Sequence, residues 1–232
     1  MVTDISLPMF KLPLKYTAKT ESGFSLVELL IVTAIFAFVF ISFFSLLSVA
    51  QSNFFNVDTG IDIRNNLRMA SEKMALELRN SGYQGGVAQF SLLAGQGTGG
   101  SDIVLFSVPI LCSSTSTLLN TNGVPANWGA PLTWGCNSYT CMNNINSCAA
   151  LAYKYVQYSI NGSSQLQRQV LDGGLNVVAG STTIIGNNIA NLTTSVNANI
   201  ITLTLTGQQF SVVGRTLTAT YTNQVLLNNA NG

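Results

Sequence analysis

One acidic residue stands where an apolar segment would normally exclude a charge. Glu28 lies near the start of a hydrophobic stretch, and residues 29–50 after it contain no charged side chain. A charged group inside a membrane segment costs about 2.5–3.5 kcal/mol on insertion scales and by default marks a functional position. No Lys or Arg lies between Lys19 and Arg64, so a nearby α-amino group is the cation that Glu28 would meet. The alternative is a carboxylate that only reaches water at the membrane interface.

The charge-free stretch is long enough to cross a bilayer. At about 1.5 Å per helical residue, residues 29–50 span roughly 33 Å, and the hydrocarbon core is about 30 Å thick. Lys11, Lys15 and Lys19 precede the stretch. The positive-inside rule therefore predicts that residues 1–23 are a cytoplasmic leader and that the rest of the chain is delivered to the outer side.

A conventional signal peptide is the alternative interpretation of this stretch. Residues 48–50 read Ser-Val-Ala, which resembles a small-x-small cleavage site before Gln51. Cleavage there would release a secreted protein such as an adhesin. The length of the stretch, beyond the usual 7–15 residues of a signal-peptide core, and the Glu28 inside it argue against this reading.

The residues around Glu28 carry a more specific signal. The segment Gly23-Phe-Ser-Leu-Val-Glu28-Leu resembles the type IV prepilin motif, or class III signal peptide. The resemblance implies that a membrane peptidase cleaves after Gly23 and methylates the new N-terminal Phe24. It also implies that Glu28 acts in subunit assembly, by neutralising the N-terminus of the adjacent pilin.

The resemblance implies partners and a location as well. The expected partners are prepilin peptidase, an inner-membrane assembly platform, and other minor and major pilins. The protein would cross the bacterial inner membrane once within residues 24–53, with its C-terminal domain in the periplasm, and then enter a pilus on the cell surface.

Residues 54–82 have the pattern of an amphipathic helix. Apolar residues recur at spacings near three and four, and charged residues occupy much of the remaining surface. We expect Asn80 to Gly82 to end this helix. The face expected to pack on a β-sheet comprises Phe54, Val57, Ile61, Leu67, Met74 and Leu78.

The end of this segment refines the resemblance. Residues 68–85, with an acid-Leu-Arg step followed by Gly82-Tyr83-Gln-Gly85, are similar to the helix end of PilW-type minor pilins. This implies a non-enzymatic subunit that primes pilus assembly or sits at the pilus tip. The J-type minor pseudopilin of type II secretion is the alternative, and a major pilin is disfavoured because major pilins tend to be shorter.

Residues 83–232 are predicted to form one β-rich globular domain. Together with the long helix this gives an α+β type IV pilin fold, with an antiparallel sheet. Asn161-Gly162 predicts a hairpin between two strands. The expected strands are residues 102–111, 151–160, 165–171, 175–178, 200–206, 209–213 and 216–226.

The charged and aromatic residues of this domain do not point to catalysis. The chain has no His, which excludes the usual metal clusters and Ser-His or Cys-His pairs. A two-carboxylate site would require Asp102 and Asp172 to meet. Lys154 and Arg168 are interpreted as surface charges of the sheet.

We therefore expect no enzyme, metal or cofactor. The glycines of residues 95–100 lack the Lys of a phosphate-binding loop. Acidic and basic residues are equal in number after residue 23, so nucleic-acid binding is not expected. Trp128 and Trp134 are interpreted as loop anchors, with a ligand surface as the alternative.

The four cysteines, Cys112, Cys136, Cys141 and Cys148, lie in a region expected in an oxidising compartment and predict two disulfides. Loop entropy does not distinguish a nested pairing (112–148, 136–141) from a sequential one (112–136, 141–148). If residues 102–111 and 151–160 are antiparallel neighbours, the nested pairing would close the base of their connection. We therefore predict the nested pairing.

Overall fold

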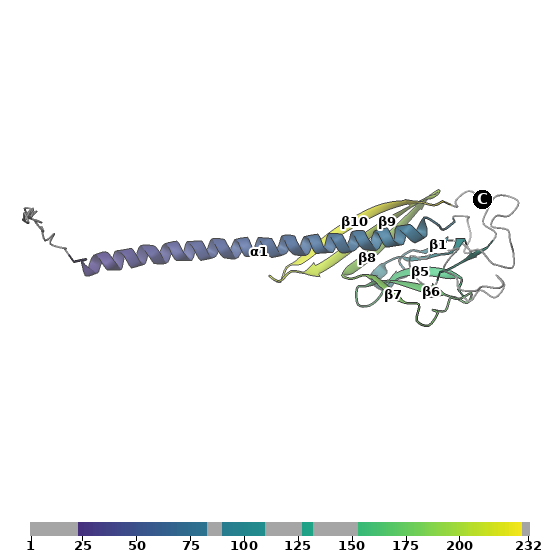
Figure 1. Ribbon diagram of the computed structural model, residues 1–232, viewed down its shortest axis with the longest axis horizontal. Coiled ribbons are helices and arrows are strands. Elements are labelled where there is room, and N and C mark those ends of the chain that lie inside the picture. The colour runs from purple at the N-terminus through teal and green to yellow at the C-terminus, as the bar shows by residue number, and fades with distance from the viewer. Residues whose placement is uncertain (1–22, 83–89, 110–126, 132–152, 229–232) are drawn as a thin grey trace, which may run out of the picture. The chain divides into compact units, whose positions relative to one another are not determined.

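The computed structural model describes residues 23–82, 90–109, 127–131 and 153–228. The chain divides into two compact units, Met1–Val49 and Ala50–Gly232, which we describe separately. Figure 1 shows one long helix and a set of antiparallel sheets, and the second part of the helix packs on those sheets. The predicted α+β class is confirmed.

The first unit contains the beginning of α1, the helix Leu26–Leu78. No Gly or Pro lies between residues 24 and 59, so nothing interrupts the helical hydrogen bonds. The Ser42 hydroxyl donates to the Phe38 carbonyl at 2.9 Å, which satisfies this side chain on its own helix. Such internal bonding suits a helix that water does not surround.

In the second unit, α1 buries one face against the sheets. Leu67, Met74 and Leu78 lie on this buried face, as predicted. The residues of the face recur at spacings of three and four, as one face of a helix requires. The buried residues are Thr59, Ile63, Leu67, Ala70, Ser71, Met74, Ala75, Glu77 and Leu78.

The prediction was wrong for the earlier part of this face. Phe54, Val57 and Ile61 are 68%, 62% and 51% exposed. Ile61 lies two residues, or about 200°, around the helix from the buried Ile63. The other two precede Thr59, which is the first buried residue.

Five antiparallel strands form the larger sheet, in the order β1-β2-β5-β6-β7. Tyr158 of β5 pairs with Val104 of β2 on one side and with Arg168 of β6 on the other. The strands are β1 Phe90–Leu93, β2 Ile103–Phe106, β5 Tyr155–Ile160, β6 Leu166–Leu171 and β7 Thr183–Gly186.

A second sheet has the order β10-β9-β8 and comprises β8 Ile189–Asn197, β9 Ile200–Phe210 and β10 Thr216–Leu226. Ile201, Leu203 and Leu205 of β9 are fully buried, and the Thr residues between them face outward. This alternation is typical of a sheet with one covered face. Two short strands, β3 Val108–Pro109 and β4 Trp128–Gly129, pair with each other, and Thr98–Gly100 forms a short 3-10 helix.

Two glycines allow the helix to approach the strands closely. A Cβ atom at Gly207 of β9 would lie 2.8 Å from Ile63 Cγ2 and 3.1 Å from Leu67 Cδ2. A Cβ atom at Gly186 of β7 would lie 3.1 Å from the Cβ of Ala70. Larger residues at these positions would push α1 away from the sheets.

The strand predictions succeeded where the apolar pattern was strong. Residues 216–226 were predicted with the observed bounds, and β5 and β6 form the predicted hairpin around Asn161. Residues 200–206 and 209–213 belong to one strand as far as Phe210, so separating them was wrong. Strands β1, β4, β7 and β8 were missed, and residues 175–178 contribute only an isolated bridge between Leu171 and Val177.

Candidate functional site

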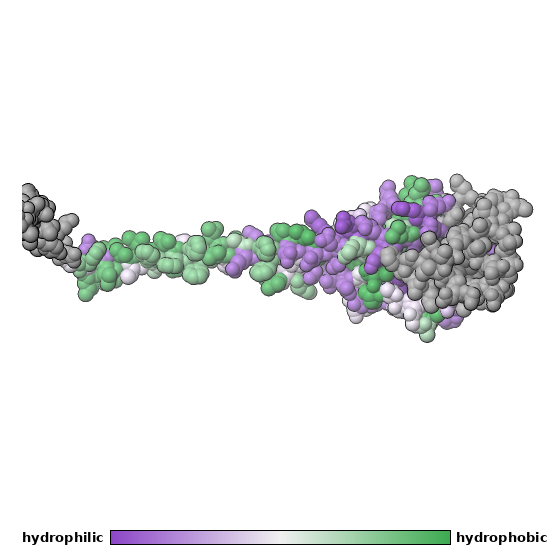
Figure 2. Space-filling view, viewed as in Figure 1, coloured by the Kyte–Doolittle hydropathy of each residue, from purple (hydrophilic) through white to green (hydrophobic). Residues whose placement is uncertain are grey.

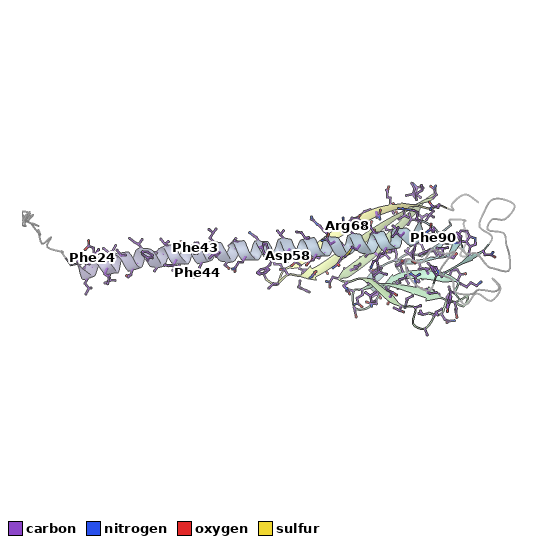
Figure 3. All side chains as sticks on the ribbon, viewed as in Figure 1. Phe24, Phe43, Phe44, Asp58, Arg68 and Phe90 are labelled. Atoms are coloured by element: carbon purple, nitrogen blue, oxygen red, sulfur yellow. The ribbon has the colours of Figure 1, made fainter. Side chains whose placement is uncertain are left out.

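The predicted processing position lies just outside the helix. Gly23, Phe24 and Ser25 precede the start of α1 at Leu26. Phe24 is 82% exposed, and Figure 3 labels it at the beginning of the helix. A peptide bond can enter a protease site only when its backbone is accessible and free of helical hydrogen bonds, and this segment meets that requirement. Cleavage after Gly23 and methylation of Phe24 stay predictions.

Glu28 has a partner in its own chain that the sequence analysis missed. The Glu28 Oε2 atom accepts a bond from the Ser25 backbone N–H at 3.4 Å, and the Ser25 Oγ atom accepts one from the Val27 N–H at 3.3 Å. Ser-x-x-Glu at a helix start is the pattern of a capping box. The spacing of Ser25 and Glu28 was therefore a signal already present in the sequence.

The first unit exposes an almost continuous apolar surface. Phe43 and Phe44 are 56% and 65% exposed, and their side chains stand off the helix in Figure 3. Figure 2 shows hydrophobic residues along this whole part of α1. Helix α1 is long and apolar enough to cross a membrane, and no residue of its most apolar segment is buried. Exposed apolar area of this size requires lipid or another protein to cover it.

The second unit contains a buried charged cluster formed by Glu77, Arg168 and Tyr158. The Arg168 Nε donates to both carboxylate oxygens of Glu77, at 3.1 and 2.9 Å. The Tyr158 hydroxyl donates to Glu77 Oε2 at 2.7 Å. The Arg168 Nη2 donates to the carbonyl of Pro131 at 2.7 Å. One cluster therefore joins α1, β5, β6 and the segment after β4.

Burial sets the chemistry of this cluster. Arg168 and Tyr158 are fully buried, and Glu77 is 7% exposed. Loss of hydration raises the pKa of Tyr158 well above its ordinary value, and the negative charge of Glu77 raises it further. The Tyr158 ring stacks on Phe106 at 5.9 Å. The tyrosine is thus held neutral as a hydrogen-bond donor, and the cluster acts as a structural joint.

This position corrects two predictions. Arg168 was interpreted as a charge on the sheet surface, but it is buried. Glu77 is one of the charged residues of 54–82 that were placed on the helix surface opposite the apolar face, and it too is buried. Leu166, Arg168 and Val170 share one face of β6, and Glu77 lies three residues after Met74 on the buried face of α1. The periodicity pointed inward for both residues. The prediction gave more weight to charge than to spacing, although paired charges can be buried.

Asp102 has a structural role between the two sheets. Its backbone N–H donates to the Leu192 carbonyl at 2.8 Å, and its carboxylate accepts bonds from the N–H groups of Gly95 and Thr194. The side chain is buried. It connects the beginning of β2 to β8.

Asp172 is exposed and organises the turn after β6. Its Oδ1 atom accepts from the N–H groups of Asn176 at 2.9 Å and Gly174 at 2.8 Å. The bonds from Asn176, together with the bond from Gly174, lower the pKa of Asp172. Backbone amides thus engage Asp102 and Asp172 separately, and the two acids do not form a joint site.

Other predicted residues lie beside shallow surfaces or outside the described parts. Lys154 is half-buried next to Trp128 and Gly173, directly before β5, the central strand of the larger sheet. Trp134 and the Tyr83 turn lie outside the described residues. The same holds for Cys112, Cys136, Cys141 and Cys148.

Strands β2 and β5 are antiparallel neighbours, which was the premise of the nested disulfide pairing. Within the part of the chain that the structure describes, no group of three or more His, Cys, Asp or Glu side chains is placed to hold a metal ion.

One comparison with known proteins identifies the N-terminal segment. The family described as "Prokaryotic N-terminal methylation motif" matches residues 18–44. No curated protein and no solved structure matches this chain. The match spans Gly23, Phe24 and Glu28 and supports a prepilin-type signal of the kind carried by type IV pilins and pseudopilins. These are structural subunits that are processed by prepilin peptidase and assemble with other pilins.

Proposed function

We propose that this protein is a minor pilin of a type IV pilus, a non-enzymatic subunit that is stored in the membrane and primes assembly or sits at the pilus tip. The observation that carries the proposal is the methylation motif over residues 18–44, together with the uninterrupted apolar helix that begins within it at Leu26 and exposes its surface. The PilW-type assignment is the finer part of the proposal and rests on the resemblance of residues 68–85.

Processing at Gly23 is the first step that the proposal requires. Prepilin peptidase would release residues 1–23 and methylate Phe24, and the domain after the anchor would face the periplasm. Mass spectrometry of the purified protein should show a chain that begins at methylated Phe24. Replacing Gly23 with a bulky residue should leave the full-length membrane protein. An N-terminus at Gln51 would instead support the secreted protein and overturn the proposal.

Glu28 would then act in assembly through its charge. In the proposal, its carboxylate neutralises the α-amino group of an adjacent subunit. The bond to the Ser25 amide offers a competing role as a helix cap. Glu28→Gln separates the two roles, because the amide oxygen can still accept the Ser25 bond but carries no charge.

Counting pili distinguishes these roles. Glu28→Ala and Glu28→Gln should both insert and be processed, since removal of a charge favours insertion. If charge neutralisation is the function, both variants fail to support pili. If capping is the function, only Glu28→Ala fails. Normal piliation in both variants would return Glu28 to the role of an interfacial carboxylate.

Deletion of the gene tests the assignment to a pilus. Loss of surface pili that is restored when retraction is blocked supports a priming role for a minor pilin. Unchanged piliation combined with failed protein secretion would favour the alternative, a J-type pseudopilin. A major pilin would instead form the bulk of purified filaments, and its loss would abolish them whether or not retraction is blocked.

The oxidation state of the four cysteines tests independently whether the domain reaches an oxidising compartment. We propose two disulfides, Cys112 with Cys148 and Cys136 with Cys141, formed after the domain reaches an oxidising compartment. The antiparallel pairing of β2 with β5 supports the nested arrangement, because Cys112 follows one of these strands and Cys148 precedes the other. Chymotryptic mapping without reductant, with cleavage after Trp134 and Tyr139, tests it. A Cys112 peptide linked only to a Cys136 peptide would refute this pairing.

A further inference from the structure

Strand β10 has one open edge. In the described part of the chain it hydrogen-bonds to β9 alone. The unpaired N–H and C=O groups of such an edge can bind a further strand, and proteins usually protect them with a charge, a Pro, a bulge or a short strand. Strand β10 has 11 residues, a regular register with β9, no Pro and no charged side chain. It therefore lacks the usual protections.

The other edge strands among the described residues are protected. Strands β1 and β7 have four residues each, and β3 and β4 have two residues each. Strand β8 has a register shift between Ile189 and Asn191. Asp102 also binds the edge of β8, through the Leu192 carbonyl and the Thr194 N–H. The open edge of β10 is thus the exception in this fold.

The hydrogen bonds at the two ends of the β9–β10 pair show which groups of β10 are free. The Ser211 N–H donates to the Arg215 carbonyl at 2.8 Å, and the Leu227 N–H donates to the Asn199 carbonyl at 2.9 Å. Bonded pairs alternate along an antiparallel ladder, so the odd-numbered residues of β10 bond to β9. The even-numbered residues direct their N–H and C=O groups to the open side. They are Thr216, Thr218, Thr220, Thr222, Gln224 and Leu226.

The two faces of β10 differ in chemistry. On the outer face, the hydroxyl groups of Thr220 and Thr222 lie 3.4 and 3.2 Å from those of Thr206 and Thr204 on β9. On the other face, Leu217, Ala219 and Tyr221 are half-buried and pack against the core. An added strand would therefore extend a row of hydroxyl groups on one face and meet α1 on the other.

Helix α1 runs beside this edge in the same direction as β10 (Figure 1). Gly207, which pairs with Ala219 of β10, lies against Ile63 and Leu67. Further along both elements, α1 and β10 share an open hollow of about 270 Å³, lined by Glu72, Ala75, Leu76, Arg79 and Asn223. Alternate side chains of an added strand would thus reach this side of α1.

This side of α1 has an excess of positive charge. At about 100° per helical residue, Arg64, Arg68 and Arg79 lie within about 60° of one another, on the same side as Ala75. We call these three residues the arginine flank, and all three are exposed. Glu72 is the one acid of the described helix on this side, and it lies 3.8 Å from Arg68. Two positive charges therefore remain without a counter-charge from α1.

The neighbouring acids of α1 point elsewhere. Asp58 and Asp62 lie about 80° and 120° around the helix from Arg68. Asp62 lies about 60° from Glu77, which faces the larger sheet. Strand β10 contains no acid, and Arg215 precedes it. The open edge is therefore bordered by cations.

The spacing of the arginine flank fits the side chains of a strand. Four helical residues, as from Arg64 to Arg68, rise about 6 Å, and two strand residues advance about 6.7 Å. Acidic side chains two residues apart on an added strand would therefore face both arginines. The same alternation places the residues between them on the outer face, beside the threonines of β10.

We propose that the open edge of β10 binds an extended acidic segment of another protein. The segment adds antiparallel to β10 as a fourth strand, with its acidic side chains over the arginine flank and small polar side chains beside the threonines. A second copy of β10 does not fit, because it supplies no acid. The proposal goes beyond the minor-pilin function and does not rest on it.

Fluorescence anisotropy with synthetic peptides tests the proposal on the full-length protein in non-ionic detergent. The probe is a labelled peptide as long as β10, in which Thr and Glu alternate. Residues opposite each other in an antiparallel pair share a face, so the N–H groups of the peptide's Thr residues would point to β10. N-methylation at the Thr residues removes these donors, whereas N-methylation at the Glu residues alters only the far edge.

We expect the peptide to bind, and we expect N-methylation at Thr to weaken binding at least tenfold while N-methylation at Glu leaves it within about twofold. Arg64→Ala combined with Arg68→Ala should weaken binding by roughly threefold to tenfold, since each pair is exposed to water. Lys154→Ala is the matched control, because Lys154 precedes β5 in the larger sheet, and it should have no effect. Absence of binding, or equal binding of the two N-methylated peptides, overturns the proposal.

Amide hydrogen exchange of the complex locates the bound peptide. Exchange should slow at the even-numbered residues of β10, such as Thr220, and change less at Tyr221, which already bonds to β9. Peptide binding without slower exchange in β10 would contradict strand addition. A DNA duplex that displaces the peptide and binds more tightly, again without slower exchange in β10, would overturn the proposal in favour of a nucleic acid on the arginine flank.

Discussion

Helix α1 contains two stretches whose side chains meet different surroundings. Before residue 50 the helix is apolar and exposed, whereas from Thr59 to Leu78 it buries a face that includes a carboxylate. The unit that contains the second stretch supplies its own cover, with Gly207 for close contact and Arg168 for charge. Among the described residues of its unit, 23–49, the first stretch has no such cover.

The comparison shows that burial in the finished assembly cannot be read from polarity alone. Glu77 is buried because residues of the larger sheet supply its hydrogen bonds. Phe43 is exposed in the structure, so lipid or another protein must cover its side chain. A lipid bilayer or the helices of neighbouring subunits fit the first stretch. The free energy of unfolding of the second unit should therefore depend on individual residue pairs that fit in charge or shape, such as Glu77 with Arg168 and Gly207 with Ile63.

Removal of the buried carboxylate should have the largest effect. Glu77→Ala leaves Arg168 buried without its counter-charge, and we expect a loss of about 3–5 kcal/mol in the free energy of unfolding. Glu72→Ala is the matched control, because its pair with Arg68 is exposed at 3.8 Å, and it should change stability by less than about 0.5 kcal/mol. Denaturant unfolding of the full-length protein in detergent measures both.

Replacement of the whole cluster sharpens this test. Glu77→Leu, Arg168→Met and Tyr158→Phe together remove every charge, and similar buried clusters have been replaced with little loss of stability. We therefore expect the triple variant to be more stable than Glu77→Ala alone. Equal stability of Glu77→Ala and Glu72→Ala would show that the cluster does not hold α1 on the sheets.

Closing the gap at Gly207 should have the next largest effect. Gly207→Ala places a Cβ atom 2.8 Å from Ile63 Cγ2, so α1 must shift, at a cost of about 1–3 kcal/mol. Gly162→Ala is the control, because nothing lies within 4 Å of the added atom. Thermal unfolding of the two variants should separate them by several degrees. Two equal melting temperatures would contradict the close packing.

Removal of the tyrosine hydroxyl should cost less. Tyr158→Phe loses one hydrogen bond to a charged group, which contributes about 1.5–3 kcal/mol in general and less here because Arg168 still pairs with Glu77. Urea denaturation near pH 7 measures the difference. A neutral result would mean that Arg168 alone satisfies Glu77.

The raised pKa of Tyr158 adds a dependence on pH. The unfolded chain loses the tyrosine proton near pH 10 while the folded protein retains it, so the folded state binds more protons and stability falls as pH rises beyond about 10. Below that pH this contribution is fully present. Stability measured between pH 8 and 11 should fall more steeply for the wild type than for Tyr158→Phe. Parallel curves would contradict the buried, neutral tyrosine.

A small stabilisation is expected at Gly60. This residue lies inside α1 near the start of its buried face, with nothing within 4 Å of an added Cβ atom. Gly60→Ala should raise the free energy of unfolding by about 0.5–1 kcal/mol if the helix is continuous there. Gly214→Ala is a contrasting control, because its φ of 75° disfavours alanine and should lower stability. Destabilisation by Gly60→Ala would indicate a break in the helix.

Local patterns predicted the regular parts of the fold. Strand residues 216–226, the hairpin at Asn161 and the helix end before Gly82 follow from alternation and turn residues. Strands β7 and β8 were missed because residues 181–199 are rich in Ser, Thr and Asn. Their pairing with β6 and β9 supplies the structure that composition does not predict.

The candidate site was predictable at its N-terminal end and less so in the β-rich unit. Gly23, Phe24 and Glu28 stand in one short segment, so their spacing is visible without a fold. Glu77 lies 81 residues before Tyr158 and 91 residues before Arg168 along the chain. Only the register of β5 with β6 and the rotation of α1 bring them together.

The sequence by itself determined the prepilin-type motif, the apolar helix and the α+β class, because each depends on residues close together along the chain. The tertiary structure alone decided which charges are buried and which apolar residues are exposed. It buried Arg168 and Glu77 as partners and left Phe54 and Val57 exposed. The physical reason is that burial depends on what lies opposite a side chain, and only the folded chain sets that neighbour.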